Sequence, residues 1–170
     1  MNYQICYFSP QGHARELADA FKTRFPSRTA IIDLRKEQSF DADICLIGFE
    51  LVKGEVDEIP ETVCKTLTKL DSSEVIAFAT CPVTITEKEH RRLEMRIKSM
   101  LPQKCRFCGM FVCRGEVYDT MTKELGYMRQ RFPYDESIAY LYDQYRKSKG
   151  HPNRNDVRNG LRFIAEALGV

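Results

Sequence analysis

The sequence predicts one α/β domain whose doubly wound parallel sheet is covered by helices on both faces. Three observations support this prediction: five short apolar segments, amphipathic segments between most of them, and a length of 170 residues, which suits a single compact domain. Each apolar segment lacks the polar alternation of a half-exposed strand, as expected for strands buried on both faces. The predicted strands span 3–8, 29–34, 43–49, 74–79 and 107–114.

The first predicted helix follows a turn that contains Ser9, Pro10 and Gly12, and Pro26 ends it. Its apolar residues recur every three or four positions, so one face of the helix points to the core. These residues are Ala14, Leu17, Ala18, Phe21 and Phe25.

The later helices are predicted from their end signals. Pro60 opens the second helix, because proline suits the first helical turn. Thr86 and Glu89 have the spacing of a capping box at the start of the third, and Pro102 ends it. Asn155 is the predicted N-cap of the last helix.

Two connections depart from the regular alternation of strands and helices. The segment 34–43 is shorter than the dozen or more residues that a crossover between parallel strands usually needs, so we expect a tight turn there. The segment 116–150 is long and contains an apolar stripe at helical spacing. It predicts one extra helix that covers an edge of the sheet. The stripe consists of Ile138, Leu141, Tyr142 and Tyr145.

The overall charge excludes a protein built mainly to bind polyanions. The chain has 26 basic and 24 acidic residues, a formal net charge of +2, so we expect no nucleic-acid partner. Its apolar runs are too short to cross a bilayer, so we expect no membrane partner. The oligomeric state has no sequence signal.

The seven cysteines are best explained as reduced thiols of a cytoplasmic protein, since their number is odd and no segment resembling a secretory signal precedes them. Cys6 and Cys45 lie inside apolar strands, where a thiol packs as a small apolar group. Cys105 and Cys108 have metal-ligand spacing, but no second close pair accompanies them, so we predict no metal site. A thiol redox pair remains an alternative for these two cysteines.

The loop at 9–14 joins the first strand directly to a helix and has the outline of a phosphate cradle. Small residues let backbone amides approach an anion, and the helix N-terminus adds partial positive charge. The loop has neither the lysine-containing pattern of a nucleotide triphosphatase loop nor a GxGxxG motif. The alternative is an ordinary strand-to-helix turn.

Several segments in order along the chain resemble flavodoxins. The turn SPQGHA at 9–14 resembles their S/T-x-x-G-x-T phosphate loop, and IGFELVKGEVDE at 47–58 is similar to a GFWxDKGxxD-type segment of one subgroup. The segment 76–80, the triplet 113–115 and the dipeptide 151–152 also resemble that subgroup. The resemblance spans nearly the whole chain and implies a flavodoxin-like, five-stranded domain over 1–170.

The resemblance also implies noncovalent binding of FMN. The residues that would hold the phosphate are Ser9, Pro10, Gln11, Gly12, His13 and Ala14. The residues that would flank the isoalloxazine ring are Phe49, Glu50, Leu51, Val52, Lys53 and Gly54 in one loop, and Ala79, Thr80, Cys81, Pro82 and Val83 in another.

The chain departs from the pattern of the family at four of these positions. Ala14 replaces a threonine whose hydroxyl would donate to the phosphate, and Ala79 replaces a glycine. Cys81 precedes a proline, which stiffens the turn. Glu50 stands where the subgroup often has tryptophan, and would bring a negative charge near the ring.

The function that the resemblance implies is electron transfer from bound FMN to a partner reductase, without a catalytic residue of the chain's own. The first alternative is a flavin-free protein of the same fold that acts as a binding or scaffolding partner. A third is a small NAD(P)H-dependent FMN reductase, but the chain has no dinucleotide fingerprint.

Overall fold

A computed structural model describes residues 1–36 and 40–170. In this part of the chain, five strands form a single sheet in the order β2-β1-β3-β4-β5, and every neighbouring pair is parallel. The five predicted strands and their parallel arrangement are confirmed, and β1 lies between β2 and β3. The strands are β1 (Tyr3–Tyr7), β2 (Ala30–Asp33), β3 (Ile44–Glu50), β4 (Glu74–Thr80) and β5 (Arg106–Cys113).

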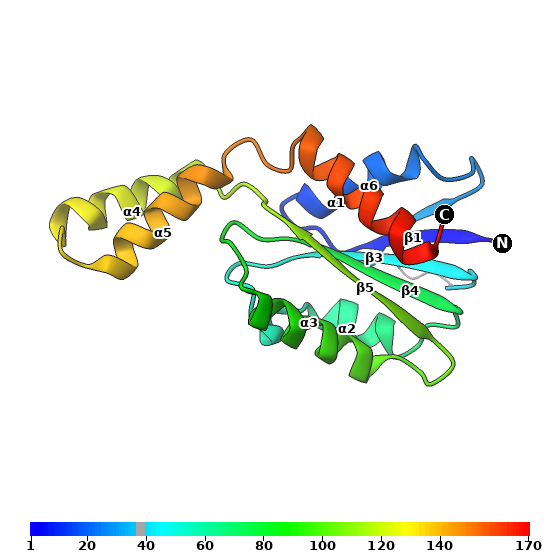
Figure 1. The fold of residues 1–170 in the computed structure, drawn as a ribbon. Helices are drawn as coiled ribbons and strands as arrows, with labels where there is room; N and C mark the ends of the chain where they lie inside the picture. Colours follow the sequence, from blue (N-terminus) through cyan, green and yellow to red (C-terminus); the bar gives the residue numbers. More distant parts are fainter. Residues whose placement is uncertain (37–39) are drawn as a thin grey trace.

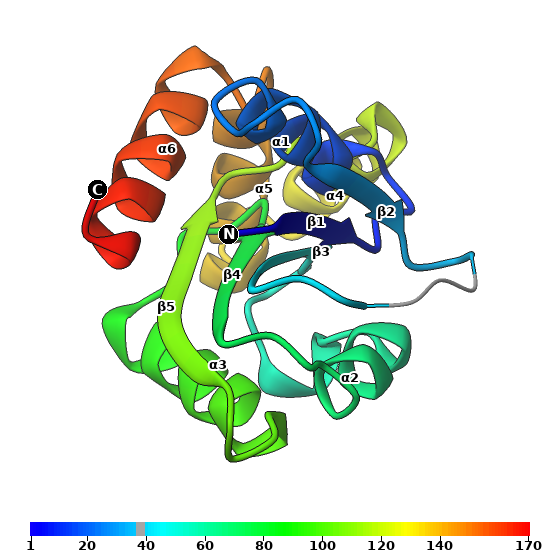
Figure 2. The ribbon, with the colours of Figure 1, turned by 90° about the vertical axis from the view of Figure 1, so that its right-hand side faces the viewer.

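The direction of strand addition reverses next to β1. The chain adds β2 on one side of β1, and then β3, β4 and β5 follow on the other side (Figure 2). Parallel pairing brings the carboxyl ends of β1 and β3 side by side, with Tyr7 opposite Gly48. In an open parallel sheet, this reversal opens a crevice at the carboxyl edge, which is where ligands bind.

Two pairs of helices cover the two faces of the sheet (Figures 1 and 2). One face carries α1 and α6, and the other carries α2, α3 and a short 3-10 helix, η1. The predicted capping box of Thr86 and Glu89 is confirmed at the start of α3. These helices are α1 (His13–Lys22), η1 (Val56–Glu58), α2 (Glu61–Leu67), α3 (Glu87–Met100) and α6 (Arg154–Leu168).

The core consists of two apolar layers, one on each face of the sheet. Along β3, Ile44 and Leu46 face the layer under α1 and α6, whereas Cys45, Ile47 and Phe49 face the layer over α2 and α3. All five side chains are buried, which explains why the strand shows no polar alternation.

Close packing joins α1 to α6. A Cβ atom on Gly160 would lie 2.6 Å from Cζ of Phe21, so glycine is required where the two helices meet. The Phe21 ring also contacts Phe78 of β4 edge to face, with centroids 5.3 Å apart. Helix α1 therefore packs tightly against both α6 and the sheet.

The segment 116–150 forms two helices, so the prediction of one extra helix on the edge of the sheet is wrong. The helices α4 (Asp119–Arg131) and α5 (Glu136–Ser148) form an antiparallel hairpin that extends away from the carboxyl edge (Figure 1). The predicted apolar stripe lies on α5, whose N-cap Asp135 accepts a hydrogen bond from the Ile138 amide at 3.1 Å, and α4 is the helix that was not expected. We call residues 119–148 the hairpin.

The hairpin leaves the domain and returns to it at one point. The Glu116 amide donates to the His151 carbonyl at 2.9 Å, and the Gly150 amide donates to the Glu116 carboxylate at 3.0 Å. Within the hairpin, the Arg129 guanidinium of α4 lies 5.1 Å from the ring centre of Tyr142 on α5. This segment is therefore an insertion between β5 and α6.

The last helix is capped by Asn153, two residues before the predicted Asn155, because the Asn153 side chain accepts from two amides of the first turn while Asp156 accepts from the Asn153 amide. The predicted tight turn over 34–43 includes residues 37–39, which lie outside the described residues. No helix in the described ranges has the length and apolar character needed to cross a membrane.

Candidate functional site

The loop between β1 and α1 directs several hydrogen-bond donors to one point. Gly12 has a φ of 91°, a left-handed conformation that glycine adopts without strain, and it gives α1 no side-chain cap. The first amides of α1 therefore need another acceptor. The backbone amides of His13 and Ala14 donate to a carboxylate. The amide of Gln11 and the hydroxyl of Ser9 donate to the same carboxylate.

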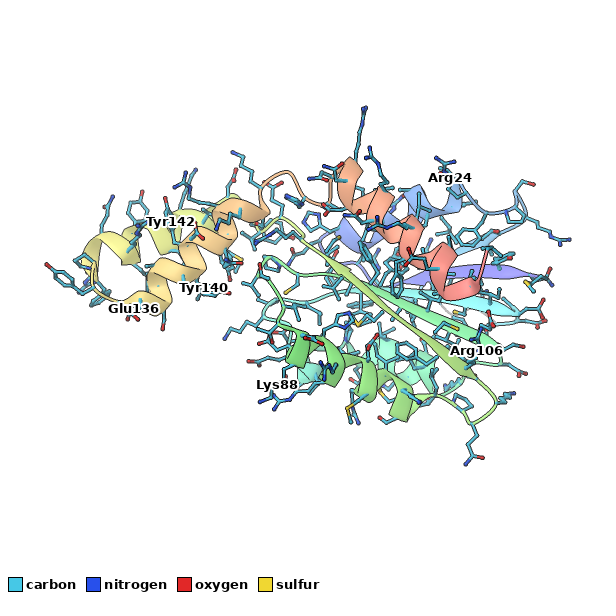
Figure 3. The ribbon with its side chains drawn as sticks, viewed as in Figure 1. Arg24, Lys88, Arg106, Glu136, Tyr140 and Tyr142 are labelled. Carbon is cyan, nitrogen blue, oxygen red and sulfur yellow. The ribbon has the colours of Figure 1, made fainter. Side chains whose placement is uncertain are left out.

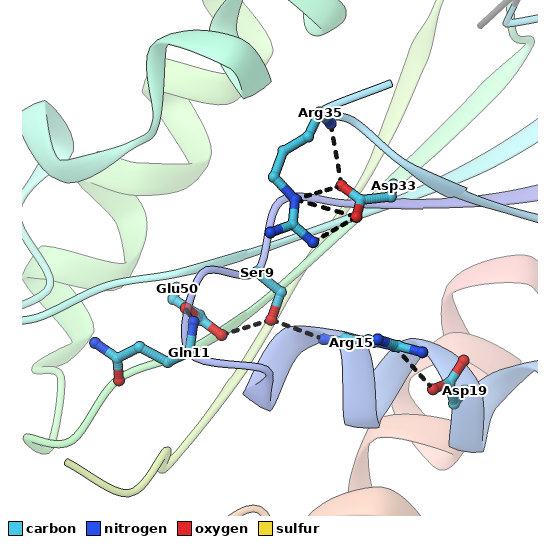
Figure 4. Close-up of polar contacts among 7 residues, drawn as sticks. All are labelled: Ser9, Gln11, Arg15, Asp19, Asp33, Arg35 and Glu50. Carbon is cyan, nitrogen blue, oxygen red and sulfur yellow. Dashed lines mark hydrogen bonds and ion pairs between the residues drawn. The ribbon is translucent and has the colours of Figure 1, made fainter. Parts of the chain in front are cut away.

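That carboxylate belongs to Glu50, the last residue of β3 (Figure 4). The Ser9 hydroxyl donates to Oε1 at 2.6 Å, the His13 amide to Oε1 at 2.9 Å and the Ala14 amide to Oε1 at 3.3 Å. The Gln11 amide donates to Oε2 at 2.9 Å. Ser9 Oγ also accepts from the Arg15 amide at 3.1 Å, which ties the loop to the helix.

The donor set is of the kind that holds a phosphate: backbone amides and a hydroxyl at a helix N-terminus. In this structure, the Glu50 carboxylate is the anion that it holds. Charge-assisted hydrogen bonds and the positive end of the α1 dipole both favour this placement. The donors of the loop at 9–14 therefore converge on one anion, and the Glu50 side chain, which was expected beside the ring, supplies that anion.

A second carboxylate organises the loop after β3. Glu58 of η1 accepts hydrogen bonds at Oε2 from the amides of Val52, Lys53 and Gly54, at 2.9, 3.0 and 3.0 Å. Gly54 has a φ of 85°, so the chain turns back around the acid. The predicted ring-flanking loop is thereby held in one shape, with Val52 and Lys53 exposed.

The third predicted loop is mostly buried. Ala79, Thr80 and Cys81 are at most 2% exposed, and Val83 is also buried. Phe49 and Leu51 of the second loop are buried as well. The buried side chains of the second and third loops pack beneath the carboxyl edge of the sheet. The exposed residues at this edge are Pro10, Gln11, Val52 and Lys53.

Arg114 and Gln144, which are not among the predicted site residues, connect the third loop to the hairpin. The Arg114 guanidinium donates to the Pro82 carbonyl at 3.1 Å, to Thr84 Oγ1 at 2.8 Å and to Gln144 Oε1 at 3.2 Å. Gln144 Oε1 also accepts from the Thr84 amide at 2.9 Å. The sequence offers one signal for this contact: Gln144 lies beside the apolar stripe of α5, and a buried side-chain amide needs polar partners.

His13 links the first loop to the base of the insertion. Its Nε2 atom lies 2.7 Å from the Glu116 carbonyl, within hydrogen-bond distance. The imidazole is therefore engaged with the chain itself, while the His13 backbone amide serves the anion site. The first loop, the second loop and the start of the insertion thus meet at the carboxyl ends of β1, β3 and β5.

The cysteines form no disulfide in the structure; all seven are free thiols. Burial raises the pKa of the Cys81 thiol to about 12, and also raises the pKa of the Cys105 and Cys108 thiols. A raised pKa disfavours the thiolate that redox exchange needs. Within 1–36 and 40–170, no three His, Cys, Asp or Glu side chains form a group that could hold a metal ion.

The chain is similar in sequence to flavodoxin-like proteins. The family model described as a flavodoxin domain matches residues 4–165. The chain is 19% identical to the flavodoxin-like domain-containing protein BilS of Clostridioides difficile, and the match covers 99% of this chain and 97% of that protein. A solved flavodoxin from the domain Archaea is 12% identical, with a TM-score of 0.45, over 88% of this chain and 99% of that one. The chain belongs to the flavodoxin domain family.

Proposed function

We propose that this chain binds FMN noncovalently at the carboxyl edge of the sheet and passes electrons to a partner reductase. The observation that carries the proposal is the loop at 9–14, whose amides and hydroxyl converge on an anion at the N-terminus of α1. Membership of the flavodoxin domain family supports the choice of FMN as the ligand.

The phosphate would be held by the Ser9 hydroxyl and by the amides of Gln11, His13 and Ala14 once the Glu50 carboxylate has left them. The loops at 49–54 and 79–83 would flank the ring and exclude water from it. When bound, FMN supplies the one- and two-electron redox chemistry, and the protein supplies its position and electrostatic surroundings. The chain itself would form no covalent bond to a substrate.

Exposed aromatic side chains on the hairpin support the part of this proposal that concerns a partner protein. Its tip exposes large apolar side chains: Tyr127 is 70% exposed and Tyr134 is 96% exposed. No side chain of α4 is buried, and Tyr140 of α5 is also exposed on this projecting element (Figure 3). Aromatic residues are enriched at protein interfaces, and an exposed group of them marks a docking surface.

The proposal also includes a cytoplasmic location. All seven cysteines are free, and Cys6 and Cys45 place their sulfur atoms only 3.9 Å apart without a bond. Reduced thiols at such short range suit a reducing compartment.

Titration of the purified protein with FMN tests the proposal. Saturable quenching of flavin fluorescence, with a dissociation constant below about 100 μM, or about −5.5 kcal/mol, is the expected result. Electron transfer is then tested by reducing the complex with dithionite under nitrogen and following oxidation by added cytochrome c. A complex that binds FMN but passes no electrons would leave only the binding half of the proposal.

A second candidate is a flavin-free flavodoxin-fold protein that acts as a binding or scaffolding partner. The occupation of the phosphate cradle by Glu50 favours this candidate, because the loop is already satisfied without a ligand. It predicts a colourless protein that shows no saturable FMN binding in the same titration. The exposed aromatic tip of the hairpin would then be its main functional surface.

A further inference from the structure

We propose that Glu50 is a ligand-specificity residue: it acts as an internal anion that competes with the phosphate of FMN for the loop at 9–14. This inference rests on the proposed function, since it concerns the same site. It adds that the chain discriminates against the phosphate-bearing form of flavin relative to riboflavin, which has the same ring without the phosphate.

The hydrogen bonds show why the two anions exclude each other. Three backbone amides and the Ser9 hydroxyl already donate to the Glu50 carboxylate at 2.6 to 3.3 Å. A backbone amide has one hydrogen, so the same donors cannot serve a phosphate at full strength at the same time. A phosphate placed at this loop would also lie close to a like charge.

The charges around the loop increase the competition. The nearby Arg35 is paired with Asp33, and Arg15 is paired with Asp19 (Figure 4). In the described part of the chain, Glu50 forms no ion pair, and its carboxylate accepts hydrogen bonds from amide and hydroxyl donors, while Arg35 interacts with it only at longer range.

The position of Glu50 allows its side chain to leave without disrupting the sheet. It is the last residue of β3, is partly exposed, and pairs with Thr80 through its backbone. Rotation of the side chain would free the donors and keep the strand intact. The cost of this rotation would be subtracted from the affinity for any phosphate-bearing ligand, and a ligand without phosphate would not incur it.

The test compares FMN and riboflavin binding to the full chain and to Glu50→Ala. We expect the variant to bind FMN at least about tenfold more tightly than the wild type, with riboflavin affinity changed by less than about twofold. Glu50→Gln keeps the size of the side chain and removes its charge, so its FMN affinity should lie between the two. Asp57→Ala is the matched control, because it removes an exposed carboxylate from the neighbouring helix η1.

The outcomes separate this inference from the proposed function. Unchanged or weaker FMN binding in Glu50→Ala would overturn the competition, and so would an equal gain for riboflavin and FMN. A gain with Asp57→Ala as large as that with Glu50→Ala would reduce the effect to net charge and overturn it too.

If neither protein binds FMN, the proposed function fails, and inorganic phosphate decides the inference. We then expect phosphate to shift the amide NMR signals of Gln11, His13 and Ala14 in the Glu50→Ala variant and to leave those of the wild type in place. No shift in the variant, or equal shifts in both proteins, would overturn the inference.

Discussion

Two loops at the carboxyl edge of the sheet are each organised around a glutamate carboxylate. The two glutamates differ in their distance along the chain from the groups that donate hydrogen bonds to them. Glu58 serves amides that precede it by 3 to 6 residues. Glu50 serves a loop that precedes it by 36 to 41 residues. The first is a local structure of one loop, whereas the second joins the ends of two neighbouring strands.

This difference predicts different consequences when each carboxylate is lost. The loop around Glu58 can open by itself, because its hydrogen bonds close only a short stretch of chain. The contact of Glu50 holds β1, α1 and β3 in one arrangement, so its loss should be felt in global unfolding. The following substitutions test this contrast, from the largest expected effect to the smallest.

Replacing Glu50 should cost the most stability. Glu50→Ala removes the acceptor of several charge-assisted hydrogen bonds, and we expect the free energy of unfolding to fall by about 2 to 3 kcal/mol. Urea denaturation measures this change, with Asp57→Ala as the control, for which less than about 0.5 kcal/mol is expected. A loss of that small size for Glu50→Ala would show that water satisfies the loop equally well.

The two left-handed glycines should differ in their tolerance of a side chain. Gly54→Ala should lower the free energy of unfolding by about 2 kcal/mol for two reasons. Alanine is strained in the left-handed conformation, and its Cβ atom would lie only 2.9 Å from Cγ1 of Ile85. Gly12→Ala should lower it by about 1 kcal/mol, because no other atom lies within 4 Å of the new Cβ. Thermal or urea unfolding of both variants checks the order, and the reverse order would contradict it.

Replacing Glu58 should have a smaller global effect and a clear local one. Glu58→Ala should lower the free energy of unfolding by about 1 kcal/mol and speed amide hydrogen exchange in residues 52–55. Hydrogen exchange followed by NMR measures both effects. Faster exchange spread over β1 and α1 would show that the loop is coupled to the whole domain, as we expect only for Glu50.

Cys81 reports on the same contrast through its reactivity. Burial, with smaller contributions from Glu58 and Glu89, raises its pKa to about 12, so at pH 8 almost all of the thiol is protonated. We expect slow labelling by iodoacetamide in the wild type, an increase with rising pH, and faster labelling in Glu58→Ala than in Glu50→Gln. Peptide mass spectrometry identifies the labelled cysteine, and fast labelling in the wild type would contradict the burial.

Much of the fold could be predicted from local patterns. The buried strands have short apolar runs, and the predicted ends of β3 and β5 lie within one residue of those observed. The capping box at Thr86 was predicted correctly because its signals lie three residues apart. The insertion was harder, since no side chain of α4 is fully buried and its apolar residues Met121 and Leu125 pack only partly against the core.

The candidate site was predictable only in part, because its loops could be located while their contacts could not. The turn at 9–14 could be located as a candidate anion site from its small residues and the helix that follows it. The occupant of that cradle depends on strand order, since Tyr7 of β1 pairs with Gly48 of β3, two residues before Glu50. Likewise, Arg114 meets Gln144 only because the hairpin returns to the carboxyl edge.

The sequence by itself determined the five strands, the helices α1, α2, α3 and α6, the capping of α3 and the turn before α1, because apolar spacing, caps and glycines act over a few residues. The tertiary structure alone decided that the Glu50 carboxylate fills the cradle and that the hairpin projects from the sheet. Parallel pairing of β1 with β3 brings distant residues to one edge, and there the electrostatic attraction between amides and a carboxylate selects the contact.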